Sequence, residues 1–136
     1  MRAVLLDTNA YTKYLRGDPA VLEALAGAGL VYMSVIVLGE LFAGFRHGSM
    51  EKVNRQILES FLGKPVVRVL EATRETADYF GLIRSALRKA GTPIPANDVW
   101  IAAHALETGS VLLTYDPHFR AVPGLRLWDE LARPEP

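Results

Sequence analysis

Short apolar runs alternate along the chain with longer stretches in which apolar residues recur at helical spacing. Residues 2–6 form a run too short and too apolar for an exposed strand, so a buried strand is predicted there. Further strands are predicted at residues 30–33, 66–70 and 110–114, with 125–128 as a candidate fifth. Helices are predicted between them, from residues 7–9 to about 16, 19 to about 28, 34 to about 47, 50–62, 73 to about 90, and 96 to about 107.

Residues of capping type mark the ends of several of these helices. Asp18 is predicted to be an N-cap, with Pro19 at the first helical position after it. Ser34 is predicted to cap another helix. Buried strands that alternate with helices indicate an α/β fold, with a central, mostly parallel sheet of four or five strands in a three-layer arrangement. A chain of 136 residues fits a single domain, expected over residues 1–132, followed by a Pro-rich tail at 133–136 that is expected to be frayed.

Four carboxylates stand where apolar segments rarely carry one: Asp7, Glu40, Asp98 and Asp116. Asp7 and Asp116 follow predicted strands, so both are expected beyond the carboxyl ends of the sheet, where open parallel sheets bind ligands. Glu40 and Asp98 lie in apolar helical segments that can reach the same edge. Burying several unpaired acids is costly, and one divalent cation with oxygen ligands satisfies them together.

The chemistry of such a cluster favours a metal-dependent hydrolase. Mg²⁺ and Mn²⁺ prefer carboxylate and water oxygens. An ion held there lowers the pKa of a water and neutralises charge on a phosphate, so phosphodiester hydrolysis is the reaction class indicated. Short polar residues beside the acids, Thr8, Asn9 and Thr114, suit a role in orienting the carboxylates.

Each acid also has a structural interpretation by itself. Asp7 can cap the helix after its strand, and Asp98 can interact with the positive end of its helix, which is worth about 0.3–1 kcal/mol. Glu40 can lie on the solvated side of its helix, and Asp116, which precedes a proline, can open a turn. Their coincidence at strand ends and helix starts favours one shared site.

Composition narrows the class of protein. With 50% hydrophobic and 22% charged residues, the chain is typical of soluble globular proteins. It has no cysteine, which excludes disulfides, thiolate metal sites and cysteine nucleophiles. No apolar stretch approaches the roughly 20 residues of a membrane span, and the first run stops at Asp7 rather than continuing as a signal peptide, so a cytoplasmic location is expected. The net charge of zero gives no global argument for nucleic acid.

Four segments in this order resemble a PIN domain and, more narrowly, the VapC-type toxin ribonucleases of toxin–antitoxin pairs. The segments are Leu5–Asn9, Gly39–Leu41, Pro95–Ala105 and Leu113–Phe119. The resemblance covers nearly the whole chain. It implies an endoribonuclease that depends on Mg²⁺ or Mn²⁺.

Site residues and partners are implied by the same resemblance. By position in the motifs, the metal-binding and catalytic acids are Asp7, Glu40, Asp98 and Asp116. Thr114 is then the supporting hydroxyl residue two positions before the last acid, and Asn9 the supporting polar residue after the first. The implied substrate is RNA. The implied protein partners are a second copy, as a homodimer, and a small cognate antitoxin that wraps the toxin and occludes the site.

Basic and imidazole side chains are secondary candidates. Arg84 and Arg88 are four residues apart and share a helix face, which is either a solvated face or a contact for the RNA backbone or for an acidic antitoxin segment. His104 is expected to be packed or capped rather than a ligand, and His118 to be a turn residue beside the site. His47 is expected to end a helix, where a cation is mildly favourable.

Two other functions fit parts of the pattern. A non-catalytic PIN-like domain would use the same acids for structure and its surface for nucleic acid or protein partners. A phosphatase acting on small phosphoesters is disfavoured, because Asp7 is not followed two residues later by a second acid and no cysteine nucleophile exists.

Overall fold

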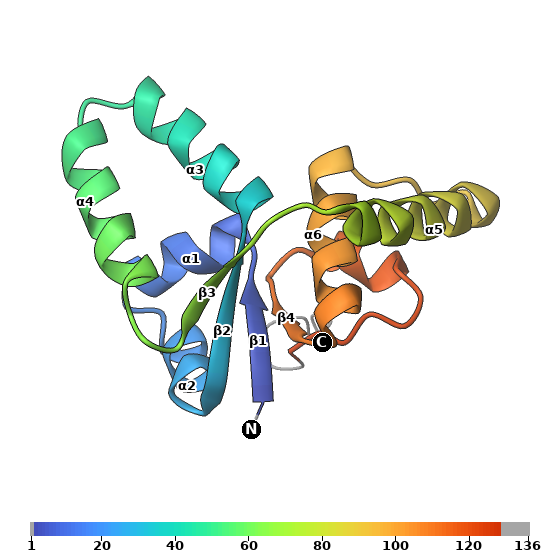
Figure 1. Cartoon of the computed structure of the whole chain (residues 1–136), viewed down its shortest axis with the longest axis horizontal. Helices are drawn as coiled ribbons and strands as arrows, with labels where there is room; N and C mark the ends of the chain where they lie inside the picture. The colour runs from blue at the N-terminus through green and yellow to red at the C-terminus, as the bar shows by residue number, and fades with distance from the viewer. Residues whose placement is uncertain (1, 129–136) are drawn as a thin grey trace.

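A parallel sheet flanked by helices forms the part of the chain that the structure, a computed structural model, describes: residues 2–128 (Figure 1). The strands are β1 (Arg2–Leu6), β2 (Ala28–Ser34), β3 (Val67–Leu70) and β4 (Val111–Leu113). Their order across the sheet is β3-β2-β1-β4, and every pairing is parallel. The predicted α/β class with a parallel sheet is therefore confirmed.

The helices lie on both sides of the strands. They are α1 (Thr8–Leu15), α2 (Pro19–Ala26), α3 (Val35–His47), α4 (Glu51–Leu62), α5 (Arg74–Ala90) and α6 (Ala96–Thr108), with a short 3-10 helix, η1, at Pro117–Ala121. In Figure 1, α1 to α4 lie to one side of the strands and α5 and α6 to the other, which gives the expected three layers. None of the helices within residues 2–128 combines the length and apolarity needed to cross a membrane.

Capping residues set the helix boundaries close to those predicted. The side chain of Asp18 accepts hydrogen bonds from the backbone of α2, with Pro19 at the first helical position. Gly109 ends α6 with φ of +66°, a left-handed conformation that glycine adopts without strain. The second helix ends at Ala26 rather than near Ala28, because the chain has already entered β2 at Ala28.

The candidate fifth strand at residues 125–128 is not a strand. Leu127 makes an isolated parallel bridge to Leu112, supported by two backbone hydrogen bonds between this segment and β4. Four strands are therefore present in the described residues. The predicted domain boundary at residue 132 and the tail at 133–136 lie outside that part of the chain.

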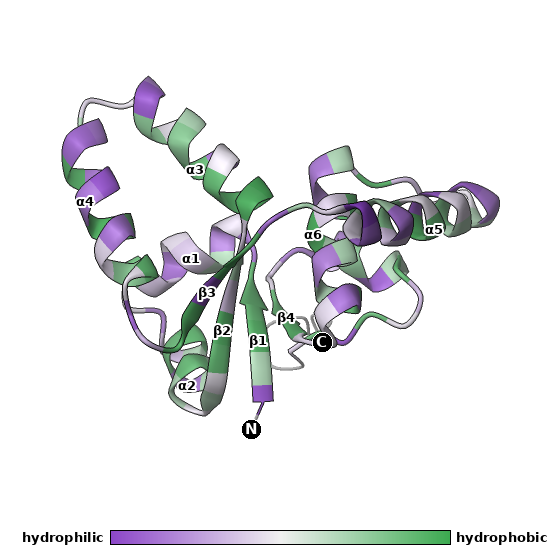
Figure 2. Ribbon diagram, in the orientation of Figure 1, coloured by the Kyte–Doolittle hydropathy of each residue, from purple (hydrophilic) through white to green (hydrophobic). Residues whose placement is uncertain are grey.

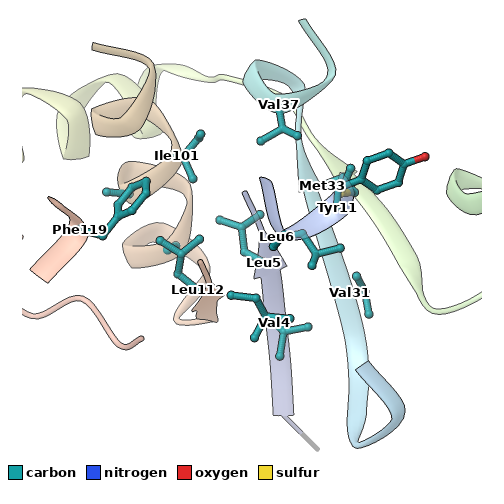
Figure 3. Packing of buried hydrophobic residues seen from close by; sticks show 14 of the residues in the cluster. Val4, Leu5, Leu6, Tyr11, Val31, Met33, Val37, Ile101, Leu112 and Phe119 are labelled. Atoms are coloured by element: carbon teal, nitrogen blue, oxygen red, sulfur yellow. The ribbon is translucent and has the colours of Figure 1, made fainter. Parts of the chain in front are cut away.

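The core surrounds β1, which is the inner strand next to β4. Val4, Leu5 and Leu6 are completely buried, and Figure 3 shows them between Ile101 on one side and Val31 on the other. Hydrophobic residues follow the strands in Figure 2, whereas hydrophilic ones gather on the outer faces of α4 and α5. A carboxylate that follows β1 therefore emerges from an inner strand whose last three residues are completely buried, which fixes its position well.

Candidate active site

Asp7 follows β1 directly and is only 5% exposed. Its Oδ1 accepts a hydrogen bond of 2.8 Å from the backbone N–H of Ala10 and so caps α1. Its Oδ2 accepts a hydrogen bond from the hydroxyl of Thr114. Burial raises the pKa of Asp7; these two donors lower it, and the charges of Asp116 and Glu40 raise it further. The structural interpretation of Asp7 as an N-cap is thus correct, but the cap uses only one of its oxygens.

Thr114 joins the ends of the two neighbouring strands. While donating to Asp7, its Oγ1 accepts a hydrogen bond of 2.9 Å from the backbone N–H of Asp116. Leu6 lies opposite Leu113 in the parallel pairing of β1 and β4, so the residues that follow them meet at one edge of the sheet. The predicted placement of Asp7 and Asp116 beyond the carboxyl ends of two strands is confirmed.

Glu40 reaches this edge from α3. The helix begins at the end of β2, where the Ser34 side chain accepts a hydrogen bond from its backbone. The hydroxyl of Thr8, one residue after Asp7, donates a hydrogen bond of 2.6 Å to Oε1 of Glu40. Glu40 is therefore turned toward the sheet rather than toward solvent, and Thr8 performs the orienting role that its chemistry suggests.

Asp98 lies in the first turn of α6 and is half-buried. Burial, together with the negative charges of Asp116, Glu40 and Asp7, raises its pKa to about 6. Asp98 and Glu40 line the same cleft, although α6 and α3 belong to different layers. A cation placed among the four acids would relieve the repulsion between them.

The four acids line one cleft of about 160 Å³ together with Thr8, Asn9 and Ile101. Its donors are carboxylate oxygens with short hydroxyls beside them, which fits a hard divalent cation such as Mg²⁺ or Mn²⁺ and not a soft one. Within residues 2–128, however, no three acidic or imidazole side chains are already arranged as a set of metal ligands. The metal site therefore stays a prediction, with a donor set that suits it.

His104 and His47 lie where they were expected, whereas His118, expected in a turn, lies in a short 3-10 helix. His104 is completely buried, with Nδ1 2.9 Å from Oγ of Ser34 and Nε2 3.0 Å from the carbonyl oxygen of Glu71. Because a carbonyl only accepts, Nε2 donates the hydrogen bond to Glu71. His118 lies in η1, exposed, with Nδ1 3.1 Å from Oδ1 of Asp116. His47 ends α3.

The remaining predicted site residues lie at the margin of the cleft or outside it. Asn9 is exposed and lines the cleft. Arg84 and Arg88 are on α5 and line a separate pocket. They share one helix face, as predicted, but are not among the residues that surround the acids.

Sequence reasoning missed two features of the site. Ile101 forms a wall of the cleft, and its position one turn after Asp98 was the signal available for it. Tyr115 fixes the loop that carries Asp116, since its hydroxyl donates a hydrogen bond of 2.7 Å to Asp18 and Lys13 Nζ lies 4.8 Å from its ring centre. Nothing local in the sequence links these three residues.

Comparisons with known proteins agree with this architecture. The model of the PIN domain family matches residues 4–125. Ribonuclease VapC2 of Rickettsia felis is 30% identical over 93% of this chain and 98% of its own length. The tRNA(fMet)-specific endonuclease VapC of Shigella flexneri is 30% identical over 95% of this chain and 98% of its own length. The crystal structure of DNA-bound VapBC from Salmonella typhimurium superposes with a TM-score of 0.82 at 28% identity, covering 94% of this chain and 98% of that one. The chain therefore belongs to the PIN domain family, in its VapC branch.

Proposed function

We propose that this protein is an endoribonuclease that requires Mg²⁺ or Mn²⁺ and acts as the toxin of a toxin–antitoxin pair. One observation carries the proposal: four carboxylates from four separate parts of the fold line a single small cleft at the carboxyl edge of the sheet. The negative charges of Glu40 and Asp116 raise the pKa of Asp7 and, together with Asp7, the pKa of Asp98, so the cleft favours a cation. The VapC ribonucleases that the chain resembles over nearly its whole length supply the substrate class.

In this proposal, Asp7, Glu40, Asp98 and Asp116 would hold the metal. When bound, the ion would supply an acidified water as nucleophile and neutralise charge on the scissile phosphate. The protein's own groups would orient these ligands: the hydroxyl of Thr114 fixes one oxygen of Asp7 while receiving the N–H of Asp116. Ile101 lines the cleft with apolar surface beside Asp98.

Partners are proposed by analogy with the relatives. Solved structures of related chains are described as VapBC complexes bound to DNA. We therefore expect a small antitoxin to bind this protein and block the cleft. We also expect the free protein to form a homodimer.

The direct test is cleavage of RNA under metal control. Because a relative 30% identical is named for tRNA(fMet), that tRNA is the first substrate to try, beside total RNA. Cleavage should stop in EDTA and return with Mg²⁺ or Mn²⁺. Asp7→Asn should also stop it without unfolding the protein, since asparagine caps a helix as well as aspartate does.

Asp78→Asn is the matched control, because Asp78 is an exposed acid on α5 outside the cleft. This variant should cleave at the wild-type rate. If EDTA and Asp7→Asn both left RNA cleavage unchanged, the acids would not form the nuclease centre. Absence of RNA cleavage together with turnover of a small phosphoester would indicate a phosphatase instead. Binding of RNA without any cleavage would indicate a non-catalytic domain.

A further inference from the structure

A second pocket lies outside the acidic cleft, between α5 and the connector at residues 91–95. It has a volume of about 300 Å³ and is lined by Arg84, Leu87, Arg88, Pro93 and Ile94. We call it the arginine pocket. It differs from the cleft in charge, because its lining contains two cations and no acid.

The two guanidinium groups have no acidic partner among the residues that the structure describes. Like charges four residues apart on a helix repel each other. The ion pairs within residues 2–128 involve Arg46, Arg55 and His118, and neither arginine of the pocket. Arg84 is half-buried, and its guanidinium lies 5.8 Å from the ring centre of Phe80. Two neighbouring cations, with no acid paired to either within the described residues, indicate a site for an external anion.

The floor of the pocket is apolar. Leu87 is 1% exposed and Ile94 8% exposed, and Pro93 adds a rigid edge beside them. An anion with a flat, weakly polar body fits this combination better than a simple inorganic ion, because cations and apolar surface are offered together. A nucleotide of single-stranded RNA has both parts, a phosphate and a base.

The arginine pocket is also continuous in sequence with the cleft. Ile94 lines the pocket, Pro95 caps α6, and Asp98 lies in the first turn of that helix. The four residue-to-residue steps from Ile94 to Asp98 span at most about 14 Å. An RNA strand whose scissile phosphate is in the cleft therefore has its neighbouring nucleotides within reach of the pocket. This favours RNA over an acidic protein segment as the occupant.

We propose that the arginine pocket binds one nucleotide of the RNA substrate that flanks the cleavage site, with its phosphate on Arg84 and Arg88 and its base on the apolar floor. This proposal rests on the nuclease function proposed above. The phosphate contact would position the strand, but it would not distinguish one base sequence from another.

The test measures RNA binding separately from cleavage. Labelled tRNA(fMet) is titrated by fluorescence anisotropy against Asp7→Asn protein, with and without Arg84→Gln and Arg88→Gln. The double change should weaken binding by about tenfold at low salt, and the slope of log affinity against log salt should become shallower by about 0.7–1.4, as one or two phosphate contacts are lost. In the cleaving protein, the same change should raise KM by a larger factor than it lowers kcat.

Two further variants separate a local effect of the pocket on RNA binding from an effect of net charge and from an effect of misfolding. Arg74→Gln with Lys52→Gln removes two exposed cations elsewhere and should leave both quantities unchanged. Arg88→Gln alone, at an exposed position, keeps the half-buried Arg84 and should show a smaller effect in the same direction. An equal loss in the Arg74 and Lys52 control would overturn the proposal, since net charge alone would then explain it.

Other outcomes identify a different occupant. If RNA binding were unchanged while binding of a polyglutamate peptide fell, the pocket would serve an acidic protein segment, and the proposal would be wrong. A change in oligomeric state by light scattering, with RNA affinity per subunit unchanged, would assign the arginines to a dimer contact and would also overturn it. If wild-type protein cleaved no RNA but the arginine effect on binding persisted, the nuclease function would fail while the RNA pocket stood.

Discussion

Replacing Asp98 with asparagine should stabilise the protein while abolishing its activity. The pKa of Asp98 rises from the ordinary value of 3.8 to about 6, first because of burial and then because of the acids around it. A carboxyl group with a raised pKa favours the folded state only while it is protonated. Its contribution is therefore fully present below pH 3.8 and is lost as the pH rises to about 6. At pH 7, the folded protein carries a charge that folding disfavours.

The size of the effect follows from the pKa. A rise from 3.8 to about 6 corresponds to about 3 kcal/mol, at about 1.36 kcal/mol per pKa unit. Asp98 is only half-buried and its repulsion is shared with neighbouring acids, so screening by solvent lowers the expected gain to about 1–2 kcal/mol. Asparagine has a similar shape and no charge at any pH.

Urea unfolding in EDTA, followed by circular dichroism at pH 7 and at about pH 3, measures this difference. Asp98→Asn should be more stable than wild type at pH 7 and equal to it at about pH 3. Excess Mg²⁺ at pH 7 should stabilise the wild type and not the variant, because only an intact ligand set gains binding free energy. Asp78 is an exposed acid, so Asp78→Asn should have the same free energy of unfolding as the wild type under every condition. An Asp98→Asn protein no more stable than wild type at pH 7 in EDTA would refute the reasoning.

Three further predictions concern the support of the site. Thr114→Val removes the hydroxyl that donates to Asp7, so it should raise the pKa of that acid further and lower stability at pH 7 by about 1–3 kcal/mol; a variant as stable as the wild type in urea unfolding at pH 7 would contradict this. His104→Ala leaves the buried hydroxyl of Ser34 and a loop carbonyl without their partner, which should cost about 2–3 kcal/mol in urea unfolding. The rate of RNA cleavage should fall as the pH falls through about 6, because protons compete with the cation for Asp98; a rate independent of pH between 5 and 7 would count against this acid as a ligand.

Local patterns predicted most of the fold. β1 and the N-cap of α1 at Asp7 were predictable, because an apolar run followed by a capping residue depends only on neighbouring positions. β2 is longer at its start than its apolar pattern indicated, since Ala28 and Gly29 have no strand signature and are recruited by pairing with β1. Residues 125–128 carry the apolar pattern of a strand, but they bond to β4 at only one bridge.

The candidate site also has a part that could be predicted from the sequence and a part that could not. Its acids could be chosen from the sequence, because a carboxylate inside an apolar run is unusual at any single position. The contacts that orient them could not. The hydrogen bond from Thr8 to Glu40 joins the first helix to the third, and the one from Tyr115 to Asp18 fixes a loop on a distant turn. Such pairs depend on packing between elements far apart in the chain, for which one sequence carries no signal.

The position of β4 beside β1 has a consequence for the order of events during synthesis. A growing chain that ends before residue 111 can already pair β1 with β2 and β3, but it leaves the other edge of β1 bare and lacks both Thr114 and Asp116. Pairing between strands this far apart along a chain is slow, because the entropy of closing a long loop is lost before stabilising contacts form. The cleft is therefore completed last, after nearly all of the domain has left the ribosome. A partly synthesised chain lacks the complete set of acids, so the assembled cleft exists only once the fold is complete.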